Sequence, residues 1–437
     1  MNPDFNSGDQ AGTGLYQITA RGRRRSSAAV AYLHGALRRR NLMLRTGARV
    51  SRILVEKGRA VGIEFVERGR TRVIRARKVV ILSAGAVATP KLLMLSGIGP
   101  AAHFGHHGIL TILDLPGVGQ NLQDHIEISL VYQLNGPHGY DRYKKLRWRA
   151  MAGLDYLLYG GGHATSNLIE AGAFWSGDRR ESLPGCQFFL VCGAGIEEGV
   201  DGVPGSNGCA VSLGQIRPHS RGEVLLASAD AGDAPRVRPN SFGDPRDLDA
   251  VAEGTLFAMD VMEQPAIRRF IERRHIPEDR VLSRDEVRRF CQREAHAALH
   301  PSGTCRMGQD DMAVVDPSLR LRGLDGLRVA DASIMPQLIS GNRPNLRMVV
   351  DFWHCCASGD GPANVAVPPA DLLYGVHVCD SMAFEAERGC EDVCHDGVPE
   401  WVAADGPVTG TRAAARSRPR YRARRRSTSW DWPRPGP

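Results

Sequence analysis

A run of four apolar residues, Val79 to Leu82, is the feature that most constrains how this chain folds. Uninterrupted apolar residues predict a strand that is covered on both faces, as in a parallel sheet. The run leads through the small residues Ser83 to Ala86 into an apolar helix predicted over residues 91–95. Small residues at such a turn either let a ligand approach the backbone or only pack the helix on the sheet. The pattern favours an α/β sheet, with a nucleotide as one ligand that it can hold.

The residues before this run alternate between apolar and polar side chains. A period of two predicts strands with one solvated face, and it occurs in segments 41–46, 48–56, 60–66 and 71–75. The turns between them contain Lys57-Gly58 and Arg68-Gly69, which suit a tight hairpin. We therefore expect an antiparallel meander, preceded by a helix over residues 26–40.

Later segments predict a second architecture. Residues 187–191, 210–216 and 223–227 have the pattern of strands, and residues 247–263 form a long amphipathic helix. These elements predict an α+β region that follows the α/β sheet.

The formal net charge of +8 is concentrated at one end of the chain. Eight arginines lie from Arg412 to Arg426, so their positive charge equals the whole net charge of the chain. A basic, proline-rich end is typical of a solvated, disordered tail, and nonspecific binding of polyanions is the alternative. We predict no specific nucleic-acid partner.

Cysteine use and hydropathy bear on the compartment and on metals. The cysteines between residues 186 and 305 are scattered, which is typical of a reduced intracellular protein.

The best candidate for a membrane-spanning segment, 79–99, is interrupted by Pro90 and Lys91, so no transmembrane segment is predicted. Residues 1–30 do not have the pattern of a secretory signal. The cysteines after residue 354 lack paired C-x-x-C spacing, so we predict no metal site, with zinc binding as the alternative. A cytoplasmic protein is expected.

His300 begins the run HPSGTCRMG, directly after a helix predicted over residues 285–298. Pro301 and Gly303 predict a turn at this place. A histidine in such a turn is either a hydrogen-bonded structural residue or a general acid/base. The run alone does not distinguish the two roles.

Four runs of the sequence resemble, in order, the glucose-methanol-choline (GMC) flavin oxidoreductases. They are GAVATPKLLMLSGIG (85–99), GVGQNLQDH (117–125), HPSGTCRMG (300–308) and RVADASIMP (328–336). The likeness extends from about Asp4 to Asn342 and is closest to the choline dehydrogenase-like branch. It implies α/β plus α+β architecture: a Rossmann-type FAD domain, and a substrate domain built on an antiparallel sheet with flanking helices.

The resemblance also implies domain boundaries. Residues 1–126 correspond to a partial FAD-binding domain, and residues 127–296 to the substrate-binding domain. Residues 297–346 return to the FAD domain with the catalytic histidine turn, and residues 347–437 are a non-family, disordered tail.

The chemistry implied by the resemblance is oxidation of a small alcohol, choline-like or another primary or secondary alcohol, to an aldehyde or ketone. Hydride passes to flavin N5 while His300 accepts or manages the hydroxyl proton. Oxygen or a quinone then reoxidises the flavin. The implied contacts to FAD are made by Val50, Ala84, Gly85, Asp331, Ala332 and Asn342. Glu170 either faces a cationic alcohol or is a solvent-facing or salt-bridged carboxylate.

Two departures from the family pattern concern this chemistry. The sequence lacks the strand, G-x-G-x-x-G and helix unit that admits the FAD pyrophosphate. Pro344 stands where the family has the asparagine that partners the catalytic histidine, unless Asn345 shifts into its place. We therefore expect a chain truncated at its front and divergent or frame-shifted after about Asn342. The alternative function is a catalytically inactive fragment that cannot hold FAD.

Overall fold

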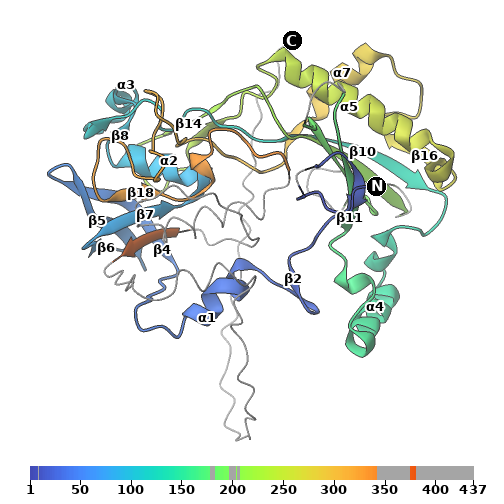
Figure 1. Cartoon of the computed structure of the whole chain (residues 1–437), viewed down its shortest axis with the longest axis horizontal. Coiled ribbons are helices and arrows are strands. Elements are labelled where there is room, and N and C mark those ends of the chain that lie inside the picture. Colours follow the sequence, from blue (N-terminus) through green and yellow to red (C-terminus); the bar gives the residue numbers. More distant parts are fainter. Residues whose placement is uncertain (8, 178–182, 196–202, 204–206, 342–374, 380–437) are drawn as a thin grey trace, which may run out of the picture. The chain divides into compact units, whose positions relative to one another are not determined.

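The computed structural model describes residues 1–341, apart from 8, 178–182, 196–202 and 204–206, together with the strand at 375–379 (Figure 1). Of the tail predicted for residues 347–437, only this strand, β19 (Gly375–Cys379), is described. The prediction of a disordered tail over residues 347–437 stays a prediction. The rest of the tail, with most of its cysteines, lies outside the described residues.

The predicted meander is present as a three-stranded antiparallel sheet. It contains β4 (Ala48–Glu56), β5 (Arg59–Glu67) and β6 (Arg70–Arg75), in that order. Both turns have positive φ at their two central residues, at Lys57-Gly58 and Arg68-Gly69, as tight hairpins require.

Two predictions ahead of the meander are wrong. Residues 41–46 are exposed and form no strand. The apolar side chains of their alternating pattern are therefore not buried. The helix predicted over residues 26–40 is shorter: η1 (Ala29–Leu33), a π-helical segment, continues into α1 (His34–Ala36). Arg38 to Arg40 lie beyond its end and are exposed.

The apolar run forms β7 (Val79–Ser83), the central strand of a three-stranded sheet. It pairs in parallel with β18 (Leu327–Val329) and antiparallel with β19. Val80 and Leu82 are fully buried, as expected for a strand covered on both faces. This parallel pair, followed by a helix, is the part of a Rossmann-type sheet that the described residues contain.

The helix after β7 begins earlier than predicted. α2 spans Gly85–Leu95 and contains Pro90 in its interior, whereas the sequence pattern placed its start after that proline. Gly85 and Ala86 are buried, and Leu93 and Met94 belong to the buried cluster that also contains residues of β4, β5 and β18.

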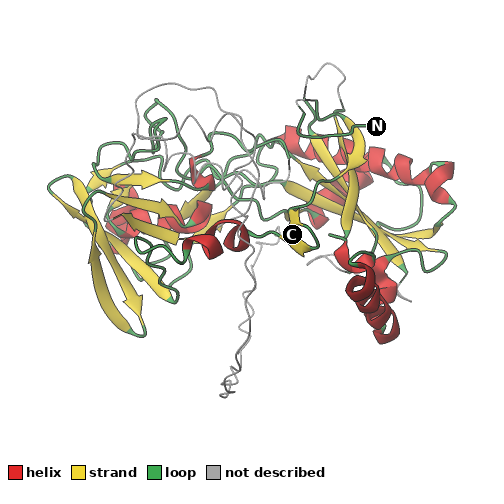
Figure 2. Ribbon diagram, turned by 60° about the horizontal axis from the view of Figure 1, so that its bottom comes forward, coloured by secondary structure: helices red, strands yellow, loops and turns green. Residues whose placement is uncertain are grey.

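The second architecture is a seven-stranded antiparallel sheet. Its order is β1 (Gly12–Leu15), β11 (Ile169–Trp175), β12 (Cys186–Val191), β13 (Gly208–Gln215), β10 (Ile126–Leu134) and β16 (Ile271–Ile276), and β17 (His296–Ala297) pairs with the start of β10. Side chains from β10, β12 and β13 form one buried cluster with the long helices α5 (Pro245–Glu263) and α7 (Arg284–Glu294). Figure 2 shows these helices beside the strands of the sheet. The predicted antiparallel sheet with flanking helices is confirmed.

The predicted elements match this region closely but not completely. The strands predicted at 187–191 and 210–216 are β12 and β13, and the helix at 247–263 is α5. The segment 223–227 forms β14 (Glu223–Leu225), which pairs with β15 (Arg236–Arg238) outside the large sheet. The helix predicted over residues 285–298 ends at Glu294, because β17 follows it. The remaining strands and α-helices of the described residues are β2 (Ala20–Arg21), β3 (Arg24–Arg25), β8 (Ile98–Gly99), α3 (Ala101–Phe104), β9 (Leu113–Asp114), α4 (Leu146–Tyr159) and α6 (Pro265–Arg268).

The start of α5 is fixed by a buried carboxylate, which yields a stability prediction. Asp247 is fully buried and accepts hydrogen bonds from Gln215 Nε2 and from the N–H groups of His219 and Ser220. Replacing Asp247 with alanine leaves these donors without an acceptor, so we expect a loss of about 3 kcal/mol in the free energy of unfolding. Urea unfolding measures it. Asp260→Ala, on an exposed position of the same helix, should change the free energy by less than about 0.5 kcal/mol, and equal losses would contradict the assignment.

Candidate functional site

The carboxyl ends of β7 and β18 are joined by the side chain of Asp331. Its Oδ2 atom accepts hydrogen bonds from the N–H of Gly85 at 2.8 Å and from Thr89 Oγ1 at 2.6 Å. Its Oδ1 atom accepts from the N–H of Ser333 at 2.8 Å. The carboxylate is 1% exposed and lies at the amino end of α2, where a negative charge is favourable. Gly85 has φ of +86°, a conformation that favours glycine.

A second joint connects α2 to the HPSGT turn. Pro90 has no N–H, so it cannot donate to the carbonyl of Ala86 four residues earlier in the helix. The hydroxyl of Thr304 donates to that carbonyl at 2.6 Å, and Thr304 is fully buried. The proline of one motif thus leaves a carbonyl that the threonine of another motif binds.

Backbone hydrogen bonds hold the HPSGT turn between two other loops. The N–H of Gly303 donates to Ala332 O at 3.1 Å, and the N–H of Cys305 donates to Ser333 O at 2.8 Å. On the other side, Ser302 and Gln123 exchange two backbone hydrogen bonds of 2.9 and 3.0 Å. A Cβ at Gly303 would lie 2.6 Å from a backbone oxygen of the facing loop, so only glycine fits there. Three of the four motifs therefore meet at one place.

This loop holds His300 against a second histidine. His125 Nδ1 and His300 Nδ1 lie 3.1 Å apart, and the two rings are nearly perpendicular at 83°. His125 Nε2 lies 3.3 Å from the carbonyl oxygen of Ile339, and His125 is only 3% exposed. Asp124 Oδ1 accepts a hydrogen bond of 2.7 Å from the backbone N–H of His300.

The two histidines line a small cavity of about 100 Å³ at the antiparallel sheet. Its other walls come from β10, β11, β12, β13 and the segment before His300, and they are Glu127, Ile169, Gln187, Phe189, Gly214, Ile216 and Ala298. Apolar walls with a few polar groups beside an imidazole are typical of a site for a small organic molecule.

The carboxylate predicted to face the substrate is not at this cavity. Glu170 Oε1 accepts a hydrogen bond of 2.8 Å from the hydroxyl of Tyr140. Hydrogen bonds from Ser166 and Tyr140 lower the pKa of the Glu170 carboxyl. Side chains alternate along a strand, and it is the neighbouring Ile169 that lines the cavity. The prediction that Glu170 faces the substrate therefore has no support from the geometry.

Glu127 is the cavity carboxylate that the sequence analysis missed. It lies two residues after His125. Side chains two positions apart in a strand lie on the same face, so a strand that ran through both residues would place both side chains on one face. That spacing in the run Asp124 to Glu127 was the available signal.

The predicted cofactor contacts fall into two groups. Ala84, Gly85, Asp331 and Ala332 lie together at the carboxyl ends of β7 and β18. Val50 is in β4, partly buried against the cluster that contains β7. Asn342, Pro344 and Asn345 lie outside the described residues, so their predicted parts in the site remain predictions.

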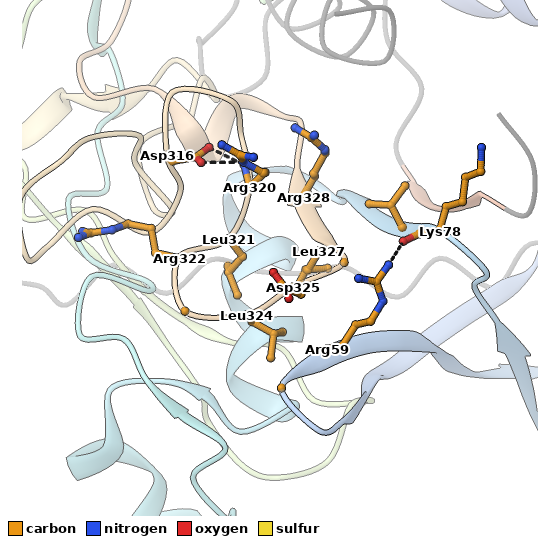
Figure 3. A pocket seen from close by; sticks show the side chains of 14 residues that line it. Arg59, Lys78, Asp316, Arg320, Leu321, Arg322, Leu324, Asp325, Leu327 and Arg328 are labelled. Atoms are coloured by element: carbon orange, nitrogen blue, oxygen red, sulfur yellow. Dashed lines mark hydrogen bonds and ion pairs between the residues drawn. The ribbon is translucent and has the colours of Figure 1, made fainter. Parts of the chain in front are cut away.

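A larger cavity, of about 600 Å³, lies at the opposite ends of the same two strands (Figure 3). Val79 and Leu327, the first residues of β7 and β18, are among its lining residues. Several of its charged groups bind other protein groups: Arg320 pairs with Asp316 at 2.9 Å, and Arg59 donates to the carbonyl of Lys78 at 2.6 Å. Ligands of parallel sheets bind beyond the carboxyl ends of the strands, so this cavity is not the candidate cofactor site.

Within the described ranges, no group of three or more histidine, cysteine or acidic side chains is placed to hold a metal ion. In the same ranges, no helix is both long enough and apolar enough to cross a membrane. Burial raises the pKa of the Cys305 thiol, so the cysteine of the HPSGTC run packs in the core and is unsuited to nucleophilic chemistry.

Comparison with known proteins identifies the family. A GMC oxidoreductase N-terminal model matches residues 1–127, and a GMC oxidoreductase C-terminal model matches residues 218–350. The chain belongs to the GMC oxidoreductase family, as its four motifs predicted. The C-terminal match extends beyond Asn342, where we expected the likeness to end.

Individual relatives agree with this assignment. The chain is 37% identical to an alcohol dehydrogenase [acceptor] of Pseudomonas putida and 39% identical to an oxygen-dependent choline dehydrogenase of Sinorhizobium medicae, over 78% of this chain and 62% of each relative. It is similar to the crystal structure of pyridoxine 4-oxidase from Mesorbium loti, with a TM-score of 0.68 and 30% identity over 77% of this chain and 62% of that one. The chain thus spans about 62% of the length of the curated relatives it matches.

The joint between Thr304 and Ala86 yields a double-mutant prediction. Thr304→Val removes the donor to the Ala86 carbonyl and should lower the free energy of unfolding by about 1–3 kcal/mol. Pro90→Ala supplies a backbone N–H to the same carbonyl, so in that background the loss from Thr304→Val should shrink by about 1 kcal/mol. Denaturant unfolding of the four proteins measures the coupling. Additive effects of the two substitutions would contradict the role of the Ala86 carbonyl as their shared acceptor. Thr71→Val, at an exposed position of β6, is the control for replacing threonine with valine.

Proposed function

We propose that this chain binds FAD and oxidises an alcohol to an aldehyde or ketone, with His300 as the acid/base. The observation that carries the proposal is the position of His300. It lines a cavity in the antiparallel sheet, while backbone hydrogen bonds join its loop to the segment that follows β18. A substrate in the cavity would therefore lie beside the imidazole.

The residues present fit one side of the cofactor. Gly85 and Ala332 bring backbone close to the carboxyl ends of β7 and β18, and α2 directs its amino end to the same place. Both oxygens of Asp331 already accept hydrogen bonds from the protein. Asp331, which accepts the N–H of Gly85, would therefore hold the shape of this turn, and the backbone of Gly85 and Ala332 would lie beside the cofactor.

The protein groups have separable tasks in the reaction. The flavin, when bound, supplies the hydride acceptor. The substrate hydroxyl donates its hydrogen bond to His300, which takes the proton as the alcohol is oxidised. Because His300 Nδ1 is engaged by His125, the substrate would meet Nε2. Ile169, Phe189 and Ile216 form the apolar part of the cavity wall, which limits the access of water to this proton transfer.

A choline-like alcohol is the proposed substrate class. Some of the relatives are named choline dehydrogenases, and the cavity contains the carboxylate of Glu127, which can balance a quaternary ammonium group. A neutral primary or secondary alcohol is the alternative, favoured by the relative named alcohol dehydrogenase. Oxygen or a quinone as electron acceptor, and a cytoplasmic location, remain predictions.

A chain that does not hold FAD is the second candidate. It is favoured by the absence of a G-x-G-x-x-G run from the sequence, since that turn normally admits the pyrophosphate. The two candidates differ in one observable, the flavin absorbance of the purified chain before and after incubation with FAD.

The role of His300 is tested with flavin-loaded protein. His300→Ala should lower kcat for alcohol oxidation by about 10²–10⁴, because it removes the proton acceptor. His106→Ala, at an exposed position outside the cavity, should leave kcat unchanged. Turnover with an artificial electron acceptor is the measurement. Flavin uptake with undiminished turnover in His300→Ala would contradict the role, and absence of flavin uptake by the unaltered chain would favour the second candidate.

The substrate carboxylate is tested by two matched substitutions. Glu127→Gln should raise KM for choline about tenfold or more and leave KM for a neutral alcohol of similar size unchanged, since only the cation loses a charge partner. Glu170→Gln, in which the carboxylate outside the cavity is neutralised, should change neither value appreciably. The reverse pattern would restore Glu170 as the substrate residue.

A further inference from the structure

We infer that His125 is a positioning residue that fixes the tautomer of His300, and so keeps the Nε2 atom of His300 as a proton acceptor. The tautomer assignment depends on the geometry of the two rings, on the carbonyl of Ile339 and on the burial of His125. Its consequence for catalysis rests on the proposed function.

The assignment starts at the carbonyl of Ile339. A carbonyl oxygen can only accept a hydrogen bond, so His125 Nε2, which lies 3.3 Å from it, carries the hydrogen. A neutral imidazole has one N–H, and its other nitrogen is an acceptor. His125 is 3% exposed, and burial disfavours the doubly protonated, charged ring. Its Nδ1 atom is therefore an acceptor.

The same reasoning passes to the second ring. His300 Nδ1 lies 3.1 Å from His125 Nδ1, and two acceptors cannot form a hydrogen bond. His300 Nδ1 must then carry the hydrogen and donate it to His125. Neutral His300 consequently has its lone pair on Nε2, the nitrogen on the far side of the ring. This is the form that can take a proton from a substrate hydroxyl.

The arrangement also suits the protonated state. After His300 has accepted a proton it still donates through Nδ1 to His125, so the hydrogen bond becomes charge-assisted and strengthens. In the opposite tautomer Nε2 would carry a hydrogen and could not act as a base. Two carboxylates belong to this arrangement: Asp124 binds the His300 backbone N–H, and Glu127 lines the same cavity.

His125 gives His300 a partner from within the described residues. In the sequence, Pro344 stands where the family has the asparagine that partners the histidine, which predicts the loss of that partner unless Asn345 takes its place. The GVGQNLQDH run ends on His125, so this loop supplies a ring contact to the HPSGT turn in addition to its backbone hydrogen bonds.

Nitrogen NMR tests the tautomer directly and needs no bound flavin. The full chain is labelled with ¹⁵N in its histidine rings, and the His300 and His125 signals are identified by their loss in His300→Ala and His125→Asn. We expect His300 to show a protonated Nδ1 and an unprotonated Nε2, with the opposite pattern in His125. His300 with a protonated Nε2 at neutral pH would overturn the inference.

Two substitutions separate positioning from packing. The Asn side chain can place its oxygen near the position of His125 Nδ1, so His125→Asn should keep the His300 tautomer, whereas His125→Phe keeps the packing and should abolish the preference. An unchanged His300 tautomer in His125→Phe would overturn the inference. If His125→Phe does not fold, His125→Leu gives the same comparison.

Kinetics of the flavin-loaded protein add the catalytic consequence. His125→Phe should lower kcat about 10²-fold or more with little change in KM, and His125→Asn should recover most of that loss. Equal losses in the two variants would contradict a role through the tautomer. A chain that takes up no flavin would count against the proposed function only, since the NMR result is obtained without it.

Discussion

The buried carboxylate of Asp331 is the interaction on which the geometry of the candidate site depends. It accepts hydrogen bonds from the first residue of α2, from a side chain within that helix and from the segment after β18. Because an unpaired buried carboxylate is very costly, these donors have few alternatives to this arrangement. The carboxyl ends of the two parallel strands are thereby held together, and the HPSGT turn binds to the segment that Asp331 anchors.

Contacts between residues of distant motifs connect Asp331 to His300 and fix the position of the imidazole. Pro90 leaves the Ala86 carbonyl without its helical donor, and Thr304 supplies one. Gly303 allows the facing loop to approach within contact distance. His300 is held through its backbone by Asp124 and through its ring by His125. The imidazole is therefore positioned by residues from several loops, which suits a group that must meet a substrate at a fixed distance.

Much of this arrangement was predictable from the sequence, and the failures have physical reasons. The uninterrupted run at Val79 predicted a buried strand, because burial on both faces leaves no polar positions. The start of α2 was misplaced because Pro90 was treated as a break, and only the tertiary hydrogen bond from Thr304 compensates its missing donor. Glu127 was missed because the face of a strand that points to a cavity is set by neighbouring strands that are distant in sequence. The pairing of His125 with His300 joins residues 175 positions apart, and no local pattern reveals it.

We propose that residues at the carboxyl ends of β7 and β18 would hold a flavin, which would supply the hydride acceptor, and that His300 takes the hydroxyl proton of the alcohol. Anaerobic mixing of the FAD-loaded chain with choline or a neutral alcohol tests it most directly, with flavin absorbance followed in time. We expect the oxidised-flavin absorbance to bleach in a single turnover, and to bleach more slowly when the reacting carbon carries deuterium. A loaded chain whose flavin stays oxidised with each alcohol, while free dithionite reduces it, would contradict the account.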